Sequence, residues 1–492
     1  MDSLPAAVNS RQASPMGAPE LRAGPSELRR SLNQRQLTML AIGGAIGVGL
    51  FLGSGVTIRL AGPGVIISYL LGAVLALIVA YSIVEMAVVH PDAGSFGVYA
   101  ETYLSRWAGF AVRATYGFVQ TIAIGAEVTA VAIYFAFWFP SVPQWVWVMA
   151  VSAGLIILNS LQVGRFGEFE YWFALIKVVA ILAFIGVGTG LIFGIGTRQT
   201  LGLSNLTSHG GFLPKGWTGV WLALTLVVTS YMGVEVIAVT AGEAERPQET
   251  IPKAMRKIVF RLIIFYSLAI AIMLAMNPWD AAGTGSGLTA SPFVRAFSSI
   301  GIPFAASLMN VVVISAALSS SNSDLYLTTR MLFSLARGRY VPSWVGKLSQ
   351  NGVPRRALAI SSAGMAAAIL LAIYAPEKAF LALYGVAVAG MFFVWTVILL
   401  THLAFRRALG PERISQLPLR LRFFPYSTYL GVVALVAIAA STFFVDGLRY
   451  SVPAFAPFLL IITAAYWMAR HKESAVQRAG LATSPRGGQS ID

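Results

Sequence analysis

The sequence predicts an all-α polytopic membrane protein with twelve transmembrane helices. Of its 492 residues, 57% are hydrophobic and only 11% are charged, and the mean hydropathy is +0.73. These values exclude an ordinary soluble enzyme. Because about 20 apolar residues cross the hydrocarbon core of a bilayer, the apolar stretches divide the chain into twelve spans. The predicted spans are 37–58, 63–88, 109–138, 144–162, 171–194, 217–241, 259–277, 301–326, 357–374, 379–404, 427–445 and 452–469.

The distribution of basic residues predicts the orientation of these spans. The net charge is +15, from 35 Lys and Arg against 20 Asp and Glu. Most of the Lys and Arg fall in the two tails and in the even-numbered connections, as the positive-inside rule requires of cytoplasmic segments. Both the disordered tail 1–36 and the polar tail 470–492 are therefore expected in the cytoplasm, on either side of one membrane domain, 37–469. The basic charge needs no nucleic-acid partner.

The composition also limits the chemistry that the chain can perform. The sequence contains no cysteine, which excludes disulfides, thiolate metal sites and cysteine nucleophiles. The four histidines show no metal-ligand spacing, and the acids within the spans are scattered, without a DDxxD or HExxH motif. We therefore predict no metal and no cofactor, and a membrane-embedded enzyme is disfavoured.

The first span, 37–58, contains the run GGAIGVGLFLGSG. Each glycine inside a helix costs about 1 kcal/mol relative to alanine, so this density predicts a span that bends or unwinds. Unwound backbone at membrane depth persists only where protein or a water-filled cavity satisfies its polar groups, and a binding site is therefore expected there. The alternative interpretation is that the glycines only allow close helix packing.

Two features predict that the chain contains two inverted copies of a five-span bundle, at 37–194 and 217–404. Span six carries a polar, glycine-interrupted stretch at 230–235, at the position that corresponds to span one. The connections 94–106 and 291–303 also match, as short amphipathic segments expected on opposite sides of the membrane. Transporters built from inverted repeats bind substrate where the broken helices of the two copies meet. The helices 427–445 and 452–469 would be additional to this core.

Few ionisable residues lie within the predicted spans, and each is a functional candidate because it costs about 2.5–3.5 kcal/mol to insert. Glu127, Lys177 and Glu235 lie in the middle of spans three, five and six. Lys177 is a lone amine among aliphatic residues, where desolvation allows it to exchange a proton. The alternative is a permanent ion pair with Glu127 or Glu235 that only braces the bundle.

Other ionisable residues are expected nearer the membrane surface. Glu85 and Asp324 lie toward the cytoplasmic ends of spans two and eight, and Arg113 is expected to extend its side chain to the cytoplasmic face. Glu243 lies at the cytoplasmic end of span six and is either a functional acid or a solvated loop residue.

Several motifs resemble those of the amino acid permeases of the amino acid–polyamine–organocation superfamily, of the bacterial amino acid transporter type. The resemblance covers residues 36–470 in the same order as in the family. It rests on GGAIGVGLFLGSG at 43–55, AGPG at 61–64, HPDAGSFGVYAE at 90–101, EVTA at 127–130, GRFGEFEYWFALIKV at 164–178, GVEVIAVTAGEAERPQETIPKA at 233–254, SSSNSDLYLTTRMLFSLARGR at 319–339 and VPRRAL at 353–358.

The resemblance implies a LeuT-like core of ten spans with spans one and six broken, and an amino acid bound between them. The substrate carboxylate is expected at exposed N–H groups near Val48, Gly49 and Leu50, where a helix begins. The ammonium group is expected at unpaired carbonyls at the ends of the first half-helices. The candidate substrate-binding residues are Ala45, Ile46, Gly47, Val48, Gly49, Leu50, Glu127, Ser230, Tyr231, Gly233 and Asn322.

The resemblance also implies roles for individual residues. Lys177 matches a span-five lysine that looks like a substitute for a sodium ion in proton-driven relatives. Glu235 and Glu243 match the two acids of span six, and these three residues are the proton-coupling candidates. Tyr231 takes the place of an aromatic residue that covers the substrate, and Asn322 takes the place of the span-eight asparagine.

Two residues depart from the family pattern. Val48 stands where a Thr or Ser is common, so a hydroxyl contact to the carboxylate is missing. Asp324 adds an acid to span eight where many relatives have a neutral residue. An acid there favours a cationic substrate, but its expected place near the cytoplasmic end favours a gate or structural role.

Together these observations predict a secondary active transporter in a bacterial cytoplasmic membrane, a proton-coupled importer of amino acids that works by alternating access. Its partners would be the amino acid, protons and the lipid bilayer, with the proton gradient as the energy source. The alternatives on the same fold are an exchanger or facilitator, and a transporter of polyamines or cationic amino acids. With one or two acids expected at the pocket, a neutral or broad substrate range is favoured.

Overall fold

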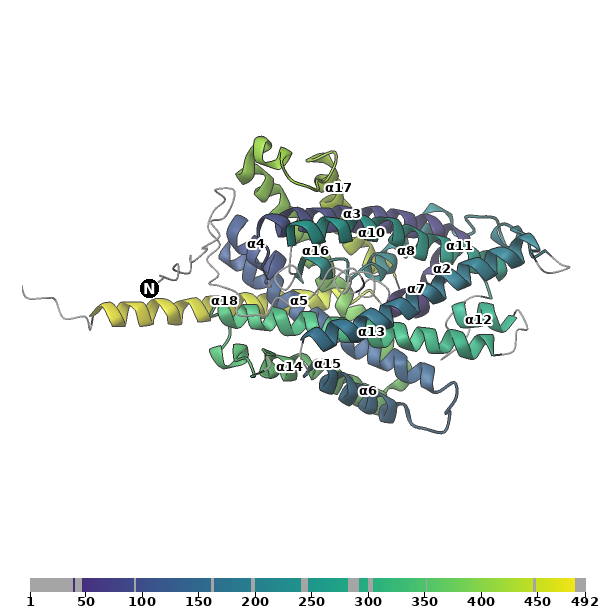
Figure 1. The fold of residues 1–492 in the computed structure, drawn as a ribbon, viewed down its shortest axis with the longest axis horizontal. Helices are drawn as coiled ribbons and strands as arrows, with labels where there is room; N and C mark the ends of the chain where they lie inside the picture. The colour runs from purple at the N-terminus through teal and green to yellow at the C-terminus, as the bar shows by residue number, and fades with distance from the viewer. Residues whose placement is uncertain are drawn as a thin grey trace, which may run out of the picture.

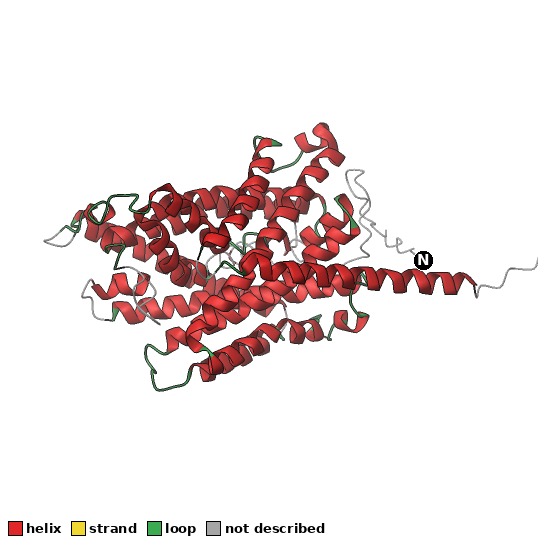
Figure 2. Ribbon diagram, turned by 180° about the vertical axis from the view of Figure 1, so that it is seen from behind, coloured by secondary structure: helices red, strands yellow, loops and turns green. Residues whose placement is uncertain are grey.

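The computed structural model describes residues 39, 47–92, 94–160, 163–195, 200–239, 247–281, 292–299, 304–350, 352–445 and 448–482, and the regular elements among them are helices (Figure 2). The first half of the predicted span one and residue Glu243 lie outside the described residues. The α-helices are α2 (Ser54–Ala61), α3 (Val65–Val89), α4 (Ser95–Tyr103), α5 (Arg106–Phe135), α6 (Gln144–Asn159), α7 (Val163–Phe193), α8 (Gly216–Ser230), α9 (Val236–Val239), α10 (Pro247–Leu262), α11 (Ala269–Met276), α12 (Pro292–Ser299), α13 (Ala305–Arg337), α14 (Arg355–Ser361), α15 (Ala363–Tyr374), α16 (Pro376–Ser415), α17 (Tyr426–Ser441) and α18 (Ser451–Ala482).

Most of the long helices run along one axis of the molecule, with α4 and α12 at opposite ends (Figure 1). Seven helical stretches among the described residues are long and apolar enough to cross a membrane, and three shorter apolar helices accompany them. Helix α13 is not among the seven, because the serines, asparagine and aspartate in its middle lower its hydropathy. The chain is thus an all-helical membrane protein.

Helix α5 is the central element of the bundle, and it packs against α4, α13, α15 and α16. The approach of α15 to α5 is close because glycines lie at the contact. A Cβ atom added to Gly125 would lie 2.6 Å from the carbonyl oxygen of Gly364, and one added to Gly364 would overlap the carbonyl oxygen of Thr121. Small residues at such positions let two helix backbones approach each other directly.

The helical hydrogen bonding is interrupted where the sequence predicts a break in span six. Helix α8 ends at Ser230, the turn 231–235 follows, and α9 begins at Val236. Within the turn Gly233 has a φ of 101°, which a residue with a side chain rarely adopts. In span one the described part begins at Gly47 with a wide π-helical turn, Gly49–Gly53, that continues into α2.

A buried ion pair fixes α4 to the bundle. Arg113 on α5 donates hydrogen bonds to the carboxylate of Glu101 on α4 and to the hydroxyl of Ser334 on α13 (3.2 Å). Tyr340 donates to the other Glu101 oxygen (2.9 Å). The expectation that Arg113 reaches the membrane surface is therefore wrong: its side chain is only 2% exposed, because an internal carboxylate is available to it.

His90, between α3 and α4, belongs to the same end of the molecule. Its Nε2 lies 2.6 Å from the Tyr103 hydroxyl, and its carbonyl oxygen accepts a hydrogen bond from Tyr99 (2.6 Å). Burial lowers the pKa of His90 to about 4, because an imidazolium is poorly solvated there. The neutral ring shares this hydrogen bond with Tyr103 and joins the end of α3 to α4.

A second buried cluster holds the end of α16 against α3. The carboxylate of Glu85 on α3 accepts hydrogen bonds from Nε (2.8 Å) and Nη2 (2.5 Å) of Arg406 and from the Leu421 amide, and it lies 3.0 Å from Nε2 of His402. Glu85 is fully buried and Arg406 is 10% exposed. The pair thus fixes both the helix and the loop that follows it.

Two helices near the C-terminal end of the sequence, α16 and α18, extend beyond the predicted spans. Helix α16 continues beyond the predicted residue 404 to Ser415, with non-helical backbone at Gly410. Helix α18 continues beyond residue 469 to Ala482 and projects from the bundle (Figure 1). Polar sequence therefore extends these helices beyond the apolar segments that hydropathy detects.

Replacing Arg406 with glutamine is expected to destabilise the protein by about 3 kcal/mol or more, because the Glu85 carboxylate would stay buried without its cation. The measurement is the thermal unfolding midpoint of the purified protein in detergent. Arg407→Gln removes the same charge from an exposed neighbour and is the matched control. Equal effects of the two substitutions would contradict the importance of the buried pair.

Gly364→Ala is expected to cost about 1–3 kcal/mol, because the added methyl group would overpack the contact between α15 and α5. Gly154→Ala on α6 is the control, since its new Cβ would meet nothing within 4 Å. Both variants are compared by thermal unfolding. A stable Gly364→Ala protein would show that these helices can separate at little cost.

Candidate functional site

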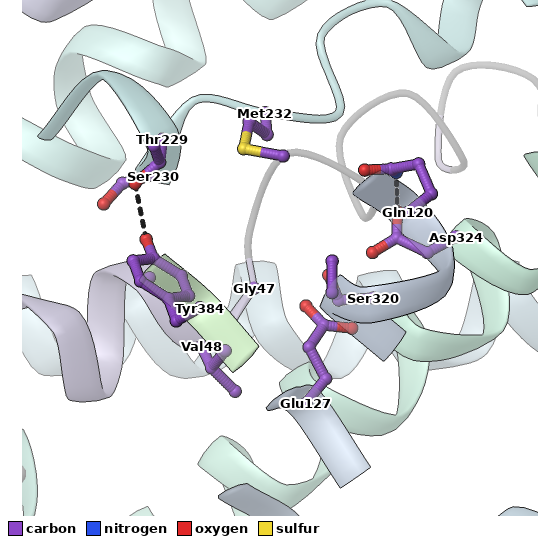
Figure 3. A pocket seen from close by; sticks show the side chains of 12 residues that line it. Gly47, Val48, Gln120, Glu127, Thr229, Ser230, Met232, Ser320, Asp324 and Tyr384 are labelled. Carbon is purple, nitrogen blue, oxygen red and sulfur yellow. Dashed lines mark hydrogen bonds between the residues drawn. The ribbon is translucent and has the colours of Figure 1, made fainter. Parts of the chain in front are cut away.

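A small enclosed cavity of about 50 Å³ lies among five parts of the chain (Figure 3). Its walls come from Gly47–Gly49 at the start of the described part of span one, from α5, from the end of α8 with Met232, from α13 and from α16. A cavity holds about one water per 10–15 Å³ measured in this way. The space therefore accommodates a few waters, and a larger occupant requires its walls to move.

One end of the cavity is lined by hydroxyl groups. Tyr384 on α16 and Thr229 on α8 share a hydrogen bond of 2.7 Å between their hydroxyl oxygens. A Cβ atom added to Gly49 would lie 3.0 Å from Cα and Oγ of Ser230 and 3.1 Å from the Tyr384 hydroxyl. Only glycine therefore lets the backbone of span one approach the end of α8 this closely.

The other end is lined by acceptors. Gln120 on α5 donates from Nε2 to Oδ1 of Asp324 on α13 at 2.6 Å. Glu127, two turns after Gln120, lies beside Gly47, whose added Cβ would be 3.0 Å from Glu127 Oε1. Oε2 of Glu127 and Oε1 of Gln120 are buried and accept no hydrogen bond within the described structure. Buried acceptors of this kind are costly unless an occupant supplies donors.

A separate polar cluster joins α6, α7 and α13 beside the cavity. The Glu170 carboxylate on α7 accepts hydrogen bonds from the Ser319 hydroxyl and from Nδ2 of Asn322 (3.2 Å). Asn159 donates in turn to Oδ1 of Asn322 (2.7 Å). Glu170 and Lys177 are both fully buried, and their seven-residue spacing places them on one face of α7. Lys177 interacts electrostatically with the carboxyl groups of Glu170, Glu127 and Asp324.

Glu235 holds the interrupted part of span six. Its two carboxylate oxygens accept hydrogen bonds from the Gly233 amide, each at 3.1 Å. Tyr116 on α5 donates to Oε1 at the same distance. The side chain therefore satisfies a backbone amide that the break in the helix leaves without a helical partner.

Of the predicted substrate-binding residues, several lie at the cavity and others do not. Ala45 and Ile46 lie outside the described residues, as does the proton-coupling candidate Glu243. Leu50, Gly233 and Asn322 do not line the cavity, and Asn322 belongs to the cluster around Glu170. The residues that do line it are Gly47, Val48, Gly49, Glu127 and Ser230.

Tyr231 is positioned differently from the predicted aromatic cover. Its hydroxyl donates to the Tyr69 carbonyl (2.8 Å), and its ring lies 4.6 Å from that of Tyr266 between centroids. The Ser230 carbonyl, expected to receive the substrate ammonium, already accepts a hydrogen bond from Tyr266 (2.8 Å). Met232 and Tyr384 line the cavity in place of Tyr231.

The sequence reasoning did not include five of the residues described above: Gln120, Glu170, Thr229, Met232 and Tyr384. It favoured a gate or structural role for Asp324, whose side chain lines the cavity. Helical spacing could have found some of them. Gln120 and Glu127 share a face of α5, as do Ser320 and Asp324 on α13 and Glu170 and Lys177 on α7. Polar residues recurring at four or seven positions in an apolar helix indicate a common polar interior. Thr229 and Tyr384 carry no such signal.

The sequence of the whole membrane domain matches known proteins. The model of the amino acid permease family matches residues 36–475. The chain belongs to the amino acid permease family. It is 39% identical over 452 residues to the "Uncharacterized amino acid permease YtnA" of Bacillus subtilis (strain 168). The aligned residues cover 91% of this chain and 97% of that protein.

Two further permeases have names that state a substrate. The "Gamma-aminobutyric acid permease" of Bacillus subtilis (strain 168) is 40% identical over 425 residues, covering 86% of this chain and 90% of the relative. The "Aromatic amino acid transport protein AroP" of Salmonella typhimurium (strain SL1344) is 36% identical over 441 residues, or 89% and 95% of the two chains. This permease is thus a membrane transport protein, and its relatives are transporters of amino acids rather than enzymes.

Gly49→Ala is expected to weaken amino acid transport roughly tenfold or more, since overpacking at the Ser230 contact costs about 1–3 kcal/mol, and Gly49→Leu to abolish it. Gly53→Ala is the control, because its Cβ would make only an ordinary 3.8 Å contact with Tyr384. Uptake into proteoliposomes is the measurement, with size-exclusion profiles to establish folding. Normal transport by Gly49→Leu would place the substrate elsewhere.

Proposed function

We propose that this permease is a proton-coupled amino acid importer that works by alternating access. The observation that carries the proposal is the enclosed cavity between the interrupted sixth span and the glycine-rich first span, with hydroxyl groups at one end and carboxylates at the other (Figure 3). A zwitterion offers the complementary charges. The names of relatives refer to γ-aminobutyric acid, threonine and serine, and aromatic amino acids, which supports a substrate of this class.

In the proposed topology the chain forms twelve transmembrane helices with a LeuT-like core. Two inverted repeats, 37–194 and 217–404, would bring spans one and six together, and α17 and α18 would be additional. The positions of α4 and α12 at opposite ends of the bundle support this arrangement (Figure 1). The protein would lie in the cytoplasmic membrane of a bacterium, with both tails in the cytoplasm.

The substrate carboxylate is assigned to the hydroxyl end of the cavity, near the backbone of Gly49, where Ser230 and Tyr384 would turn their O–H groups toward it and away from Leu226 and Thr229. The ammonium group is assigned to the acceptor end, where Glu127 Oε2 is buried without a donor. This differs from the carbonyl site that the family resemblance implies, because the Ser230 carbonyl is already engaged by Tyr266.

Lys177 is assigned the coupling of protons to transport, with Glu235 as a second candidate. Lys177 is fully buried on α7 beside Glu170, which is hydrogen-bonded to Ser319 and Asn322 of α13. Gain or loss of one proton in this cluster changes the net charge between α7 and α13, and so biases their relative position. An inward proton gradient would then drive accumulation of the amino acid.

An exchanger or facilitator on the same fold is the second candidate. It is favoured by the carboxylates of Glu170 and Glu127 around Lys177, which suit a permanently charged amine that only braces the helices. In that case counterflow would proceed without a proton gradient.

Uptake into proteoliposomes made with the wild-type protein is expected to require an inward proton gradient, and Lys177→Met is expected to lose this dependence. Lys347→Met removes an exposed lysine and should behave as wild type. The measurement is labelled amino acid accumulation with and without the gradient, together with the pH change inside the vesicles. Accumulation independent of the gradient, or full coupling in Lys177→Met, would favour the exchanger.

A further inference from the structure

We propose that Asp324, held by Gln120, makes this permease selective for amino acids whose side chain carries a positive charge. This inference rests on the proposed transport function and names the substrate class of the same cavity. The residue is a departure from the family pattern in this chain, and its position in the structure favours a role in binding a cationic substrate over the gate or structural role that its place in the sequence favours.

Asp324 lies at the cavity rather than at the cytoplasmic end of α13. It lines the space together with Ser320, one helical turn earlier on the same face. Its Oδ1 accepts the hydrogen bond from Gln120 Nε2 (2.6 Å), and the side chain is 8% exposed. The bond to α5 fixes the direction of the carboxylate while using only one of its oxygens. Asp324 is therefore an oriented acceptor at the wall of the cavity (Figure 3).

The charges at the cavity are unbalanced. Two carboxylates, Glu127 and Asp324, line it, and there is no Lys, Arg or His among the described residues that do so. The buried amine nearest to them, Lys177, is shared with Glu170 on the far side of α13. Carboxylates enclosed at membrane depth require cations or donors close by. A cationic occupant would complement these two carboxylates.

The cavity also lacks hydrogen-bond donors for two of its acceptor atoms. Glu127 Oε2 and Gln120 Oε1 are buried without a donor among the described residues. The α-ammonium group of an apolar amino acid would pair with Glu127 alone. Asp324 would then face the apolar side chain of that substrate. A second cation, at the end of the substrate side chain, would satisfy both Asp324 and the Gln120 oxygen.

The arrangement of the walls gives this second cation a place. The hydroxyl end, with Thr229 and Tyr384, lies across the cavity from Asp324 and Gln120 in Figure 3. A substrate with its carboxylate at the hydroxyl end thus extends toward the acids. Met232 forms part of the wall, and a methionine side chain readily changes conformation to enlarge a pocket. The cavity of about 50 Å³ favours a short cationic side chain over a long one.

The test compares two substrates of nearly equal shape, ornithine and norleucine, in which a terminal ammonium replaces a methyl group. Labelled uptake of each is measured in proteoliposomes containing the full-length protein. We expect the wild type to prefer ornithine in kcat/KM by roughly tenfold or more, because a buried acceptor rejects an analogue that lacks the matching donor. Ornithine should also raise the thermal unfolding midpoint more than norleucine does.

Asp324→Asn keeps the shape of the side chain and an oxygen for Gln120 but removes the charge. It is expected to lower ornithine transport roughly tenfold or more while norleucine transport is retained, which also shows that the variant is folded. Glu412→Gln removes one negative charge from an exposed position on α16 and should leave the ratio unchanged.

A wild type that prefers norleucine, or an ornithine-to-norleucine ratio unaltered in Asp324→Asn, would overturn the assignment while leaving the proposed function intact. Uptake of neutral amino acids without ornithine would do the same. Absence of uptake for every amino acid would instead contradict the proposed transport function, so the two failures are distinguishable.

Discussion

The structure depends on one constraint, that polar groups enclosed in a membrane bundle must find partners inside it. Lipid offers neither donors nor counter-ions, so buried charged groups are paired within the protein. Glu85 forms an ion pair with Arg406, and Arg113 forms one with Glu101. Glu235 accepts a hydrogen bond from the Gly233 amide. The Glu85–Arg406 pair joins segments far apart in the sequence, whereas the other two pairs are local, and together they hold helices of the bundle in position.

At the cavity this matching is incomplete. Elsewhere the buried acids have cations or several donors, but Glu127 and Gln120 each retain an oxygen without a donor in the described structure. The same deficit would be a flaw in a protein that only had to be stable. In the proposed transport function it has a role, because an occupant that completes the hydrogen bonds would stabilise the closed cavity, and one that cannot do so would be rejected. The hydrogen bonds that are missing without a substrate would then make the protein selective for the substrate that supplies them.

Much of the fold could be predicted from the sequence, because hydropathy and glycine placement follow directly from the bilayer. The apolar stretches locate helices such as α3 and α5, and the polar run around Gly233 marks the interruption after α8. The candidate site could be predicted only in part. Gly47, Gly49 and Glu127 line the cavity, and the sequence singles them out by the density of glycines in one span and by an acid in the middle of another.

The remaining features depend on pairings between helices that one sequence does not reveal. Hydropathy alone predicts that the Arg113 side chain extends to the membrane surface. It is buried instead, because Glu101 on the preceding helix supplies a carboxylate partner. Tyr231 turns toward Tyr69 and Tyr266 because the turn after α8 directs it there. Asp324 was placed from the estimated end of its span, but α13 continues to Arg337 and moves the residue to the interior.

Helix α13 also explains how the cavity and the lysine cluster can influence each other. Ser320 and Asp324 face the cavity, whereas Ser319 and Asn322 face Glu170 on a different side of the same helix. In the proposed mechanism, a change of charge at Lys177 or an occupant at Asp324 would therefore act on this one helix from different sides. Coupling between two sites requires an element whose position both of them bias. Because neighbouring residues of α13 belong to both sites, no longer pathway through the protein is needed: protonation and substrate binding would each alter the preferred position of this helix relative to α5 and α7.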